Sequence, residues 1–339
     1  AIFPFSKEMH ALIRFPELLS FEVTQIYDLI TTGRVGSNTN HLLKIDQENH
    51  VINNINDIEY DKFDTFILGH TRKLSCFFGW NGLKNLILKL LHNEKNIYSF
   101  DDLSIIYPNI YDINELNRIY TPKIQYEQND YAPFGKLYRN GKPTIGIFGT
   151  SSCQGKFTLQ LILRNLFINN NYNVGQIGSE PTSMLFDFDS CIPFGYDSTI
   201  NLTNLEFIQY INQEIYRINK KDVDVIICGS QSGTITYDVG NLYNFPVSQT
   251  NFLMATDPDI VVLCINAFDP ISDINRTIQF IEACVDTKVI ALCVYPMERK
   301  NPELGIYSAV KRLDEHNYIL LRETLTKSCF LPVYLLGND

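Results

Sequence analysis

The chain has 339 residues, of which 45% are hydrophobic and 19% are charged. This balance supplies enough apolar material for a sizeable core and too little charge for a disordered chain. Its 28 Lys and Arg against 38 Asp and Glu give a net charge of −10. Such an acidic chain disfavours general binding to nucleic acids or to anionic membranes, although a local basic site remains compatible with it.

The cysteines and histidines show no metal-binding or disulfide spacing. The eight cysteines include no Cys-x-x-Cys pair, and Cys228, Cys264 and Cys293 lie inside apolar runs. This pattern is typical of buried thiols in a reducing compartment. No apolar run reaches the ~18 residues of a membrane span, and the first residues lack the basic leader of a secretory signal. We therefore expect a soluble, cytoplasmic protein with no membrane partner.

Strand-like and helix-like segments alternate through the first part of the chain. The expected strands are the short apolar runs Ala1–Phe5, Glu22–Tyr27, Asp64–Leu68 and Asn96–Phe100. The expected helices between them are Lys7–Leu19, Asn38–Lys44 and Gly82–His92. This alternation predicts a parallel sheet with crossover helices. Residues 1–120 are therefore predicted to form a Rossmann-like or flavodoxin-like domain.

The alternation stops over residues 121–142. This segment contains Pro122, Pro133, Gly135 and Gly141, and it has no helical period. Such a composition predicts a linker. The alternative is a segment that packs across a cleft.

A second α/β pattern begins at Pro143. The expected strands are Thr144–Gly149, Asn173–Gly178, Val223–Cys228, Asp259–Ile265, Lys288–Tyr295 and Pro332–Leu336. The expected helices are Lys156–Ile168, Thr203–Ile218, Ser272–Cys284 and Val310–Lys327. Strands with intervening helices predict a doubly wound parallel sheet. Residues 143–339 are therefore predicted to form a domain like those of P-loop NTPases.

The most informative segment joins the first strand of this second domain to its first helix. It reads Gly149-Thr150-Ser151-Ser152-Cys153-Gln154-Gly155-Lys156-Phe157-Thr158. Glycines let successive backbone N–H groups turn into one concavity, and the helix start and Lys156 add positive charge, which predicts a phosphate site. The common P-loop has four residues between its first glycine and Gly-Lys, and this chain has five. Phe157 takes the place of the usual magnesium-binding hydroxyl, which Thr158 would supply; an incidental turn is the alternative.

The longer spacing resembles dethiobiotin synthetase and its relatives, whose loop reads GTxxxxGKT. The loop together with Val223–Gly233 and Met254–Cys264 also resembles a P-loop family that includes D-glutamate N-acetyltransferases. That family has a GTxCxxGKxT loop, a strand ending in EGQGS and a later PDAxVLC strand. The resemblance covers about residues 143–296. The segments Phe5–His10 and Leu68–Thr71 are similar to a subgroup found in bacterial, bacteriocin-type peptide maturation systems.

One position departs from that family pattern. Cys228 stands where the family has Glu, and in many P-loop enzymes the acid at this strand end orients magnesium. Its duty would pass to Glu180, Asp187 or Asp189 after the second strand, with the hydroxyl of Thr158; each acid is otherwise an ordinary loop residue. Beyond Cys228, the side chains at two positions are candidate catalytic groups in contact with the ligand, or else turn residues. These two are Gln231 and Ser232.

Five weaker candidates complete the set. Cys153 lies near a helix start, where a thiol pKa falls, and is either a nucleophile or a loop-packing residue. His10 and His70 follow N-terminal strands, where the ligand sites of open α/β sheets gather. Gly33–Gly36 is an anion-binding turn or an ordinary loop, and Tyr196–Thr199 is a lid or a surface loop.

These residues support three hypotheses. In the first, the chain is an enzyme of peptide natural-product maturation that binds ATP or GTP with Mg²⁺ at Gly149–Thr158 and acts on a peptide or carboxylate. Lys156 would then neutralise phosphate charge. In the second, the loop holds the phosphates of acetyl-CoA in an N-acyltransferase. In the third, the chain is a non-catalytic, nucleotide-sensing subunit of a maturation complex. We expect a homo-oligomer and no nucleic-acid partner.

Overall fold

The computed structural model describes residues 1–43, 45, 50–106, 117–122, 135–194, 202–236, 246–299 and 310–336. The chain divides into two compact units. The first is Ala1–Ile124 with Pro181–Asp187, and the second is Gln125–Glu180 with Phe188–Asp339. Within the first unit, the hydroxyl of Tyr98 donates a hydrogen bond to the carbonyl oxygen of Pro181.

In the described part of the first unit, six parallel strands form a sheet with the order β3-β2-β1-β4-β5-β6. They are β1 (Ile2–Phe3), β2 (Ile26–Asp28), β3 (Ile52–Asn54), β4 (Thr65–Leu68), β5 (Asn96–Ser99) and β6 (Ile119–Tyr120). This is the strand order of the Rossmann fold, whereas a flavodoxin-like sheet has the order 2-1-3-4-5. The predicted α/β fold is confirmed, and the strand order selects its Rossmann-like form.

The helices of this unit are mostly short. They are α1 (His10–Arg14), α2 (Thr39–Leu43), α3 (Thr71–Phe78), α4 (Trp80–His92) and α5 (Leu103–Ile106). The prediction of one helix over Lys7–Leu19 was wrong, because α1 lies between two 3₁₀ turns, Lys7–Met9 and Pro16–Leu18. Pro16 has no N–H and disfavours helical geometry in the residue before it, which ends α1.

The strands described in the second unit form a seven-membered parallel sheet with the order β15-β12-β11-β7-β10-β8-β9. They are β7 (Thr144–Gly149), β8 (Val174–Gly178), β9 (Ser190–Cys191), β10 (Val225–Gly229), β11 (Ile260–Asn266), β12 (Lys288–Tyr295) and β15 (Val333–Leu335). The strand that leads into the glycine-rich loop, β7, therefore lies at the centre, between β10 and β11.

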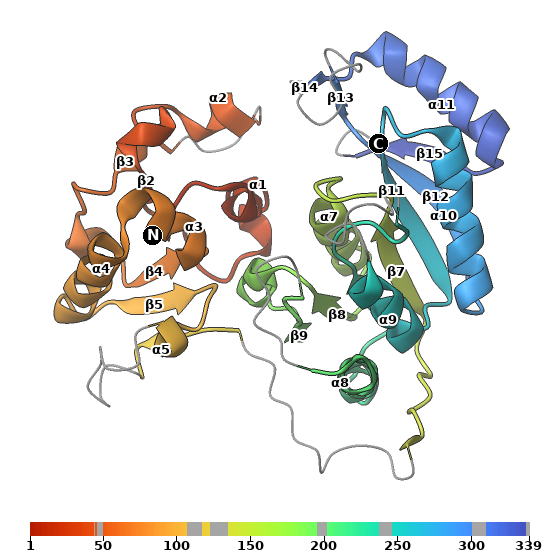
Figure 1. The fold of residues 1–339 in the computed structure, drawn as a ribbon, viewed down its shortest axis with the longest axis horizontal. Coiled ribbons are helices and arrows are strands. Elements are labelled where there is room, and N and C mark those ends of the chain that lie inside the picture. Colours follow the sequence, from red (N-terminus) through yellow and green to blue (C-terminus); the bar gives the residue numbers. More distant parts are fainter. Residues whose placement is uncertain are drawn as a thin grey trace. The chain divides into compact units, whose positions relative to one another are not determined.

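Helices cover both faces of this sheet. They are α7 (Lys156–Asn169), α8 (Asn204–Asn219), α9 (Val247–Thr256), α10 (Ile271–Cys284) and α11 (Glu315–Cys329). With right-handed crossovers, the strand order places α7 on one face and the other four helices on the opposite face. Figure 1 shows α10 and α11 side by side, away from α7. The predicted doubly wound sheet is confirmed.

The prediction of a helix over Val310–Lys327 was partly wrong. Strand β14 (Val310–Arg312) pairs antiparallel with β13 (Met297–Arg299), and α11 begins only at Glu315. The carboxylate of Asp314 accepts a hydrogen bond of 2.8 Å from the backbone N–H of Asn317, which caps the helix there.

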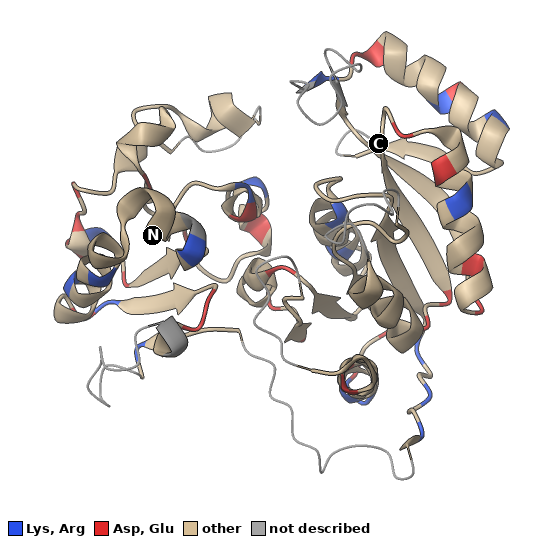
Figure 2. Ribbon diagram, in the orientation of Figure 1, with Lys and Arg blue, Asp and Glu red and all other residues tan. Residues whose placement is uncertain are grey.

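Charged side chains are interspersed on the outer helices. Figure 2 shows acidic and basic residues following one another along α10 and α11, so neither helix presents a stripe of one sign that would attract a polyanion. Within the described residues, no helix combines the length and the apolar composition that crossing a bilayer requires.

Candidate functional site

The glycine-rich loop leaves the carboxyl end of β7 and enters α7 through two residues in the left-handed region. Cys153 has a φ of 59° and Gly155 a φ of 76°. Gly155 is the residue before α7, and no side chain caps this helix. Left-handed residues before an uncapped helix start are the backbone arrangement that binds anions in many α/β proteins.

The side chain of Lys156 folds back over the loop. Its side chain is buried, at 7% exposure, and its Nζ donates a hydrogen bond of 2.7 Å to the carbonyl oxygen of Ser151. A Cβ atom at Gly149 would lie 3.1 Å from this Nζ and 2.6 Å from Oε1 of Gln154. The first glycine of the loop therefore leaves the space into which the lysine folds back.

A carboxylate that was not predicted from the sequence organises the loop. Oδ2 of Asp269, just after β11, accepts hydrogen bonds from the hydroxyl of Thr150, from Nε2 of Gln154 at 3.1 Å and from the backbone N–H of Asn266 at 2.8 Å. Nδ2 of Asn266 donates to Oγ of Ser151 at 3.0 Å, and Oε1 of the buried Gln154 accepts from the N–H of Ser151 at 2.9 Å. The loop is thus tied to the exit of the neighbouring strand.

The exit of β10 lies against the same loop. The backbone N–H and the hydroxyl of Thr234 both donate to the carbonyl oxygen of Gly149, each at 2.9 Å. A Cβ atom at Gly233 would come within 2.5 Å of the carbonyl oxygen of Thr150. The structure therefore brings the segment with Gln231 and Ser232 beside the loop, as the hypothesis that they contact a ligand requires.

Cys228 is a core residue and not a substitute acid. Burial raises the pKa of its fully buried thiol to about 12, so the side chain is neutral near pH 7. Its strand neighbour Ile227 packs with Leu159 of α7, and successive residues of a strand point to opposite faces. Cys228 therefore points away from α7.

The other metal-ligand candidates lie on separate segments of the second unit. Oδ2 of Asp189 accepts a 2.8 Å hydrogen bond from the N–H of Gln176, and Oδ1 pairs with Nζ of Lys221 at 2.5 Å, so this carboxylate serves the β8–β9 connection. Glu180 is the second residue after β8, and Thr158 lies partly exposed in the first turn of α7. In the part of the chain that the structure describes, no three His, Cys, Asp or Glu side chains form a metal-binding group.

The structure places two further candidate residues on the surface. Cys153 is exposed in the loop, and Asp187 is an exposed residue of the first unit with a φ of 55°. The predicted lid, Tyr196–Thr199, lies outside the described residues.

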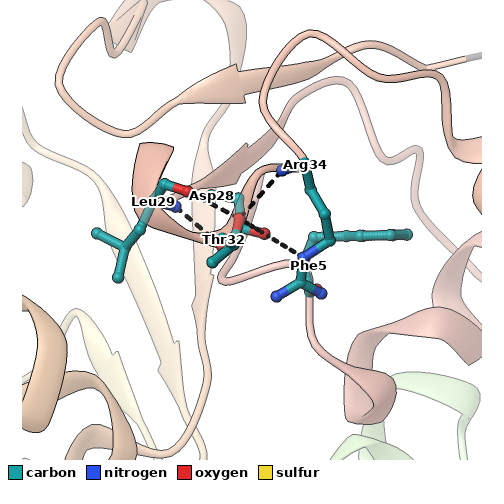
Figure 3. Close-up of polar contacts among 5 residues, drawn as sticks. All are labelled: Phe5, Asp28, Leu29, Thr32 and Arg34. Atoms are coloured by element: carbon teal, nitrogen blue, oxygen red, sulfur yellow. Dashed lines mark hydrogen bonds and ion pairs between the residues drawn. The ribbon is translucent and has the colours of Figure 1, made fainter. Parts of the chain in front are cut away.

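In the first unit, the predicted anion turn serves a structural tie. Figure 3 shows Arg34 reaching Asp28, with Nε 3.0 Å from Oδ2, and also donating to the carbonyl oxygen of Phe5. Asp28 is fully buried, and it also accepts from the N–H of Leu29 at 2.9 Å and from the hydroxyl of Thr32 at 3.1 Å. Burial raises the pKa of Asp28 against the opposing effect of these partners.

This tie argues against dinucleotide binding by the first unit. In Rossmann domains that bind dinucleotides, an acid after the second strand holds a ribose, and a glycine-rich turn follows the first strand. Both carboxylate oxygens of Asp28 already have protein partners, and the segment from Pro4 to Met9 contains no glycine.

The two candidate histidines differ in their surroundings. Nδ1 of His70 lies 2.9 Å from Oδ1 of Asp101, whose Oδ2 accepts from the N–H and the hydroxyl of Thr71. Burial alone would raise the pKa of Asp101, but these hydrogen bonds outweigh it and hold the pKa below its usual range. His10 lies against Phe5 with ring centroids 4.8 Å apart, and its Nε2 is buried with no partner among the described residues.

His10 makes stability depend on pH. Burial, with the nearby positive charges of Arg14 and Arg34, lowers its pKa from 6.5 to about 4. The unfolded chain therefore takes up a proton between these values while the folded chain does not, so stability falls as the pH drops from 6.5 to 4. We expect His10→Phe to remove on the order of 2 kcal/mol of this loss, measured by urea unfolding across that range. Retention of the wild-type pH dependence in His10→Phe would contradict the assignment.

Comparison with known proteins supports the fold. No protein-family model and no curated protein matches the chain. The chain shares its fold with a DUF1611 family protein. That protein, from Anabaena variabilis, has a TM-score of 0.65 at 12% identity, over 97% of this chain and 90% of its own. At this identity the likeness shows the two-unit α/β fold and nothing further.

Two further solved structures match less well. One is a nucleotide-binding protein from Archaeoglobus fulgidus in complex with ADP, with a TM-score of 0.38 at 13% identity over 58% of this chain and 82% of that one. The other is chloroplast FtsY from Physcomitrella patens, with a TM-score of 0.37 at 13% identity over 62% of this chain and 64% of that one. None of the three links the chain to D-glutamate N-acetyltransferases or to bacteriocin-type systems, so those resemblances stay predictions.

Proposed function

We propose that the second unit binds the phosphate groups of a nucleoside triphosphate at residues 149–158. The position of Lys156 carries this proposal. Its buried ammonium group lies 2.7 Å from the carbonyl oxygen of Ser151, at the start of a helix that no side chain caps. Positive charge and backbone N–H groups therefore converge on one concavity, as phosphate binding requires.

Side-chain hydrogen bonds hold the loop in its shape without a ligand. Asp269 and Asn266 fix Thr150, Gln154 and Ser151 through the hydrogen bonds described above. Donors that are held in place need no reorganisation when charge develops on a phosphoryl group, which strengthens electrostatic stabilisation. In this arrangement Lys156 neutralises charge on the terminal phosphates.

Magnesium fits the oxygen-rich surroundings of the loop. The ion prefers oxygen ligands, keeps several waters and uses phosphate oxygens of its nucleotide. Oγ of Ser230 and Oε1 of Gln231 are buried oxygens without a partner in the described part of the chain, which suits bound water. The hydroxyl of Thr158 and the carboxylate of Glu180 would hold the ion, which supplies charge neutralisation of the phosphates. Asp189 does not belong to this proposed set, because its carboxylate is occupied.

The substrate class rests on the sequence. The similarity of Phe5–His10 and Leu68–Thr71 to bacteriocin-type systems supports a peptide or carboxylate substrate in peptide maturation, with Gln231 and Ser232 in contact with the reacting group. The neutral Cys228 favours a second candidate, in which the loop holds the phosphates of acetyl-CoA and no acid is needed to orient a metal. A nucleotide-sensing subunit without catalysis is compatible with the same loop.

Calorimetric titration with ATP, GTP and acetyl-CoA, each with and without Mg²⁺, tests the proposal. We expect magnesium-dependent binding of ATP or GTP, weakened tenfold or more in Lys156→Ala because a charged hydrogen bond to phosphate is lost. Lys84→Ala, on the exposed face of α4, is the control and should bind as the wild type does.

Other outcomes decide against this function. Binding of acetyl-CoA alone would favour the acyltransferase. Absence of binding by all three ligands would identify residues 149–158 as an ordinary turn. Light scattering on the same samples would test the predicted homo-oligomer.

A further inference from the structure

Three residues next to the glycine-rich loop, which is residues 149–158 and is called the phosphate loop from here on, carry side-chain oxygen atoms with no hydrogen-bond partner in the described part of the chain. The atoms are Oγ of Ser179, Oγ of Ser230 and Oε1 of Gln231. Ser179 and Ser230 are almost completely buried, with exposures of 1% and 2%. A buried polar atom without a partner is costly to the fold, and in native proteins it commonly marks a place for water, an ion or a ligand.

The sheet register brings these atoms to one place. The last paired residues of β8 and β10 are Ile177 and Cys228, and the two serines follow each of them by two residues. Nε2 of Gln231 donates a hydrogen bond of 2.9 Å to the carbonyl oxygen of Ser179, which joins the two strand ends. The residues that carry the three oxygens therefore lie together at the carboxyl edge of the sheet, where open α/β sheets bind ligands.

The same strand ends contact the phosphate loop. The N–H of Ser230 donates to the carbonyl oxygen of Ile147 in β7 at 3.0 Å. Three residues further on, Thr234 donates twice to the carbonyl oxygen of Gly149. The strand ends that carry the unpartnered oxygens therefore lie next to the loop that Lys156 folds over.

The orientation of the Gln231 amide identifies the chemistry of the missing partner. A carbonyl oxygen only accepts hydrogen bonds, so the amide atom facing the carbonyl of Ser179 is the nitrogen and the other atom is the oxygen. The backbone N–H of Gln231 is also fixed, because it donates to Oε1 of the buried Gln249 at 3.0 Å. Oε1 of Gln231 is therefore a fixed acceptor that needs a donor.

We propose that Ser179, Ser230 and Gln231 form a subsite for O–H or N–H donor groups beside the phosphate loop. This subsite rests on the proposed nucleotide binding. Two sources supply such a group next to a bound triphosphate: the waters of a bound Mg²⁺ and the nucleophile that meets the terminal phosphate. With Cys228 in place of an acid, neutral oxygens take over the positioning of either one.

The test uses the full chain with Ser179→Ala and Ser230→Ala, singly and together. Ser272→Ala, which changes an exposed serine of α10, is the matched control. Each protein is titrated with ADP, with ADP and Mg²⁺, and with ADP, Mg²⁺ and aluminium fluoride, which mimics the transferring phosphoryl group with a water in line. Thermal unfolding without ligand is measured in parallel. Because the alanine variants lose an unpartnered hydroxyl, we expect them to melt at the wild-type temperature or slightly above it.

We expect the alanine variants to bind ADP without Mg²⁺ as the wild type does. Their affinity should be tenfold or more below that of the wild type once Mg²⁺, or Mg²⁺ with aluminium fluoride, is added. A loss on adding Mg²⁺ assigns the subsite to metal-bound waters, and a loss confined to aluminium fluoride assigns it to the nucleophile. Wild-type affinity in all three titrations would overturn the subsite, as would an equal loss already with ADP alone or a melting temperature several degrees lower. If the wild type binds GTP rather than ATP, GDP takes the place of ADP in these titrations. If it binds neither ATP nor GTP, nucleotide binding fails as a function and the subsite fails with it.

Discussion

Replacement of Asp269 by alanine is expected to lower the free energy of unfolding by about 3 kcal/mol, since buried donors lose a charged acceptor. Thr150, Gln154 and Asn266 all donate to this carboxylate. Gln154 is 1% exposed, so its amide would be left without water as a substitute. The loop would lose its fixed shape, and under the proposed function ATP affinity should fall by tenfold or more, because ordering the loop would then oppose binding.

Urea unfolding and calorimetry measure both effects. Asp269→Asn should lie between alanine and the wild type, because it keeps one acceptor oxygen but brings an NH₂ group against the donors of the loop. Asp222→Ala removes an exposed acid of the same unit and is the control. Equal stabilities of Asp269→Ala and Asp222→Ala would show that the carboxylate does not organise the loop.

Gly155→Ala is expected to destabilise the chain by about 3 kcal/mol, as the sum of a left-handed backbone cost and an overpacked side chain. Gly155 has a φ of 76°, and its added Cβ would lie only 2.1 Å from Cδ2 of the buried Leu336. Gly33 has a similar φ of 70°, but nothing lies within 4 Å of the position of its Cβ. Gly33→Ala should therefore show the backbone cost alone, about 1 kcal/mol.

The difference between these two variants measures the contact with Leu336. Thermal and urea unfolding of Gly155→Ala, Gly33→Ala, Leu336→Ala and the double variant Gly155→Ala with Leu336→Ala complete a cycle. The double variant should lose less stability than the two single variants lose together, because the methyl group of alanine enters the space that Leu336 leaves. Additive effects at Gly155 and Leu336, or equal costs at Gly155 and Gly33, would contradict the packing seen at the loop.

Most of the fold can be predicted from local sequence patterns. The strand, loop, Gly-Lys and helix around residues 149–158 follow each other directly in the sequence, so their order alone predicts the arrangement. The long buried strands, such as β11 and β12, were predicted because their apolar runs are continuous. The short strands β3 and β9 were missed, because segments of two or three residues with polar members carry no periodicity.

Features that depend on strand neighbours could not be predicted. Asp269 follows Thr150 by 119 residues, and only the pairing of β11 with β7 brings them together. The same limit applies to Asp189, whose carboxylate is bound by Lys221 across the fold. The face on which Cys228 lies could not be predicted either. The sequence places it at a strand end, but only the packing of Ile227 shows which face it takes.

The tie between Thr150 and Asp269 has a consequence for synthesis on the ribosome. Chains grow at about 5–20 residues per second, so roughly 6–24 s separate the two residues during translation. Throughout that interval the nascent loop lacks the carboxylate that orders it, together with β11, which flanks β7 on one side. Under the proposed function, the loop therefore becomes able to hold a phosphate only late, after β11 has paired with β7.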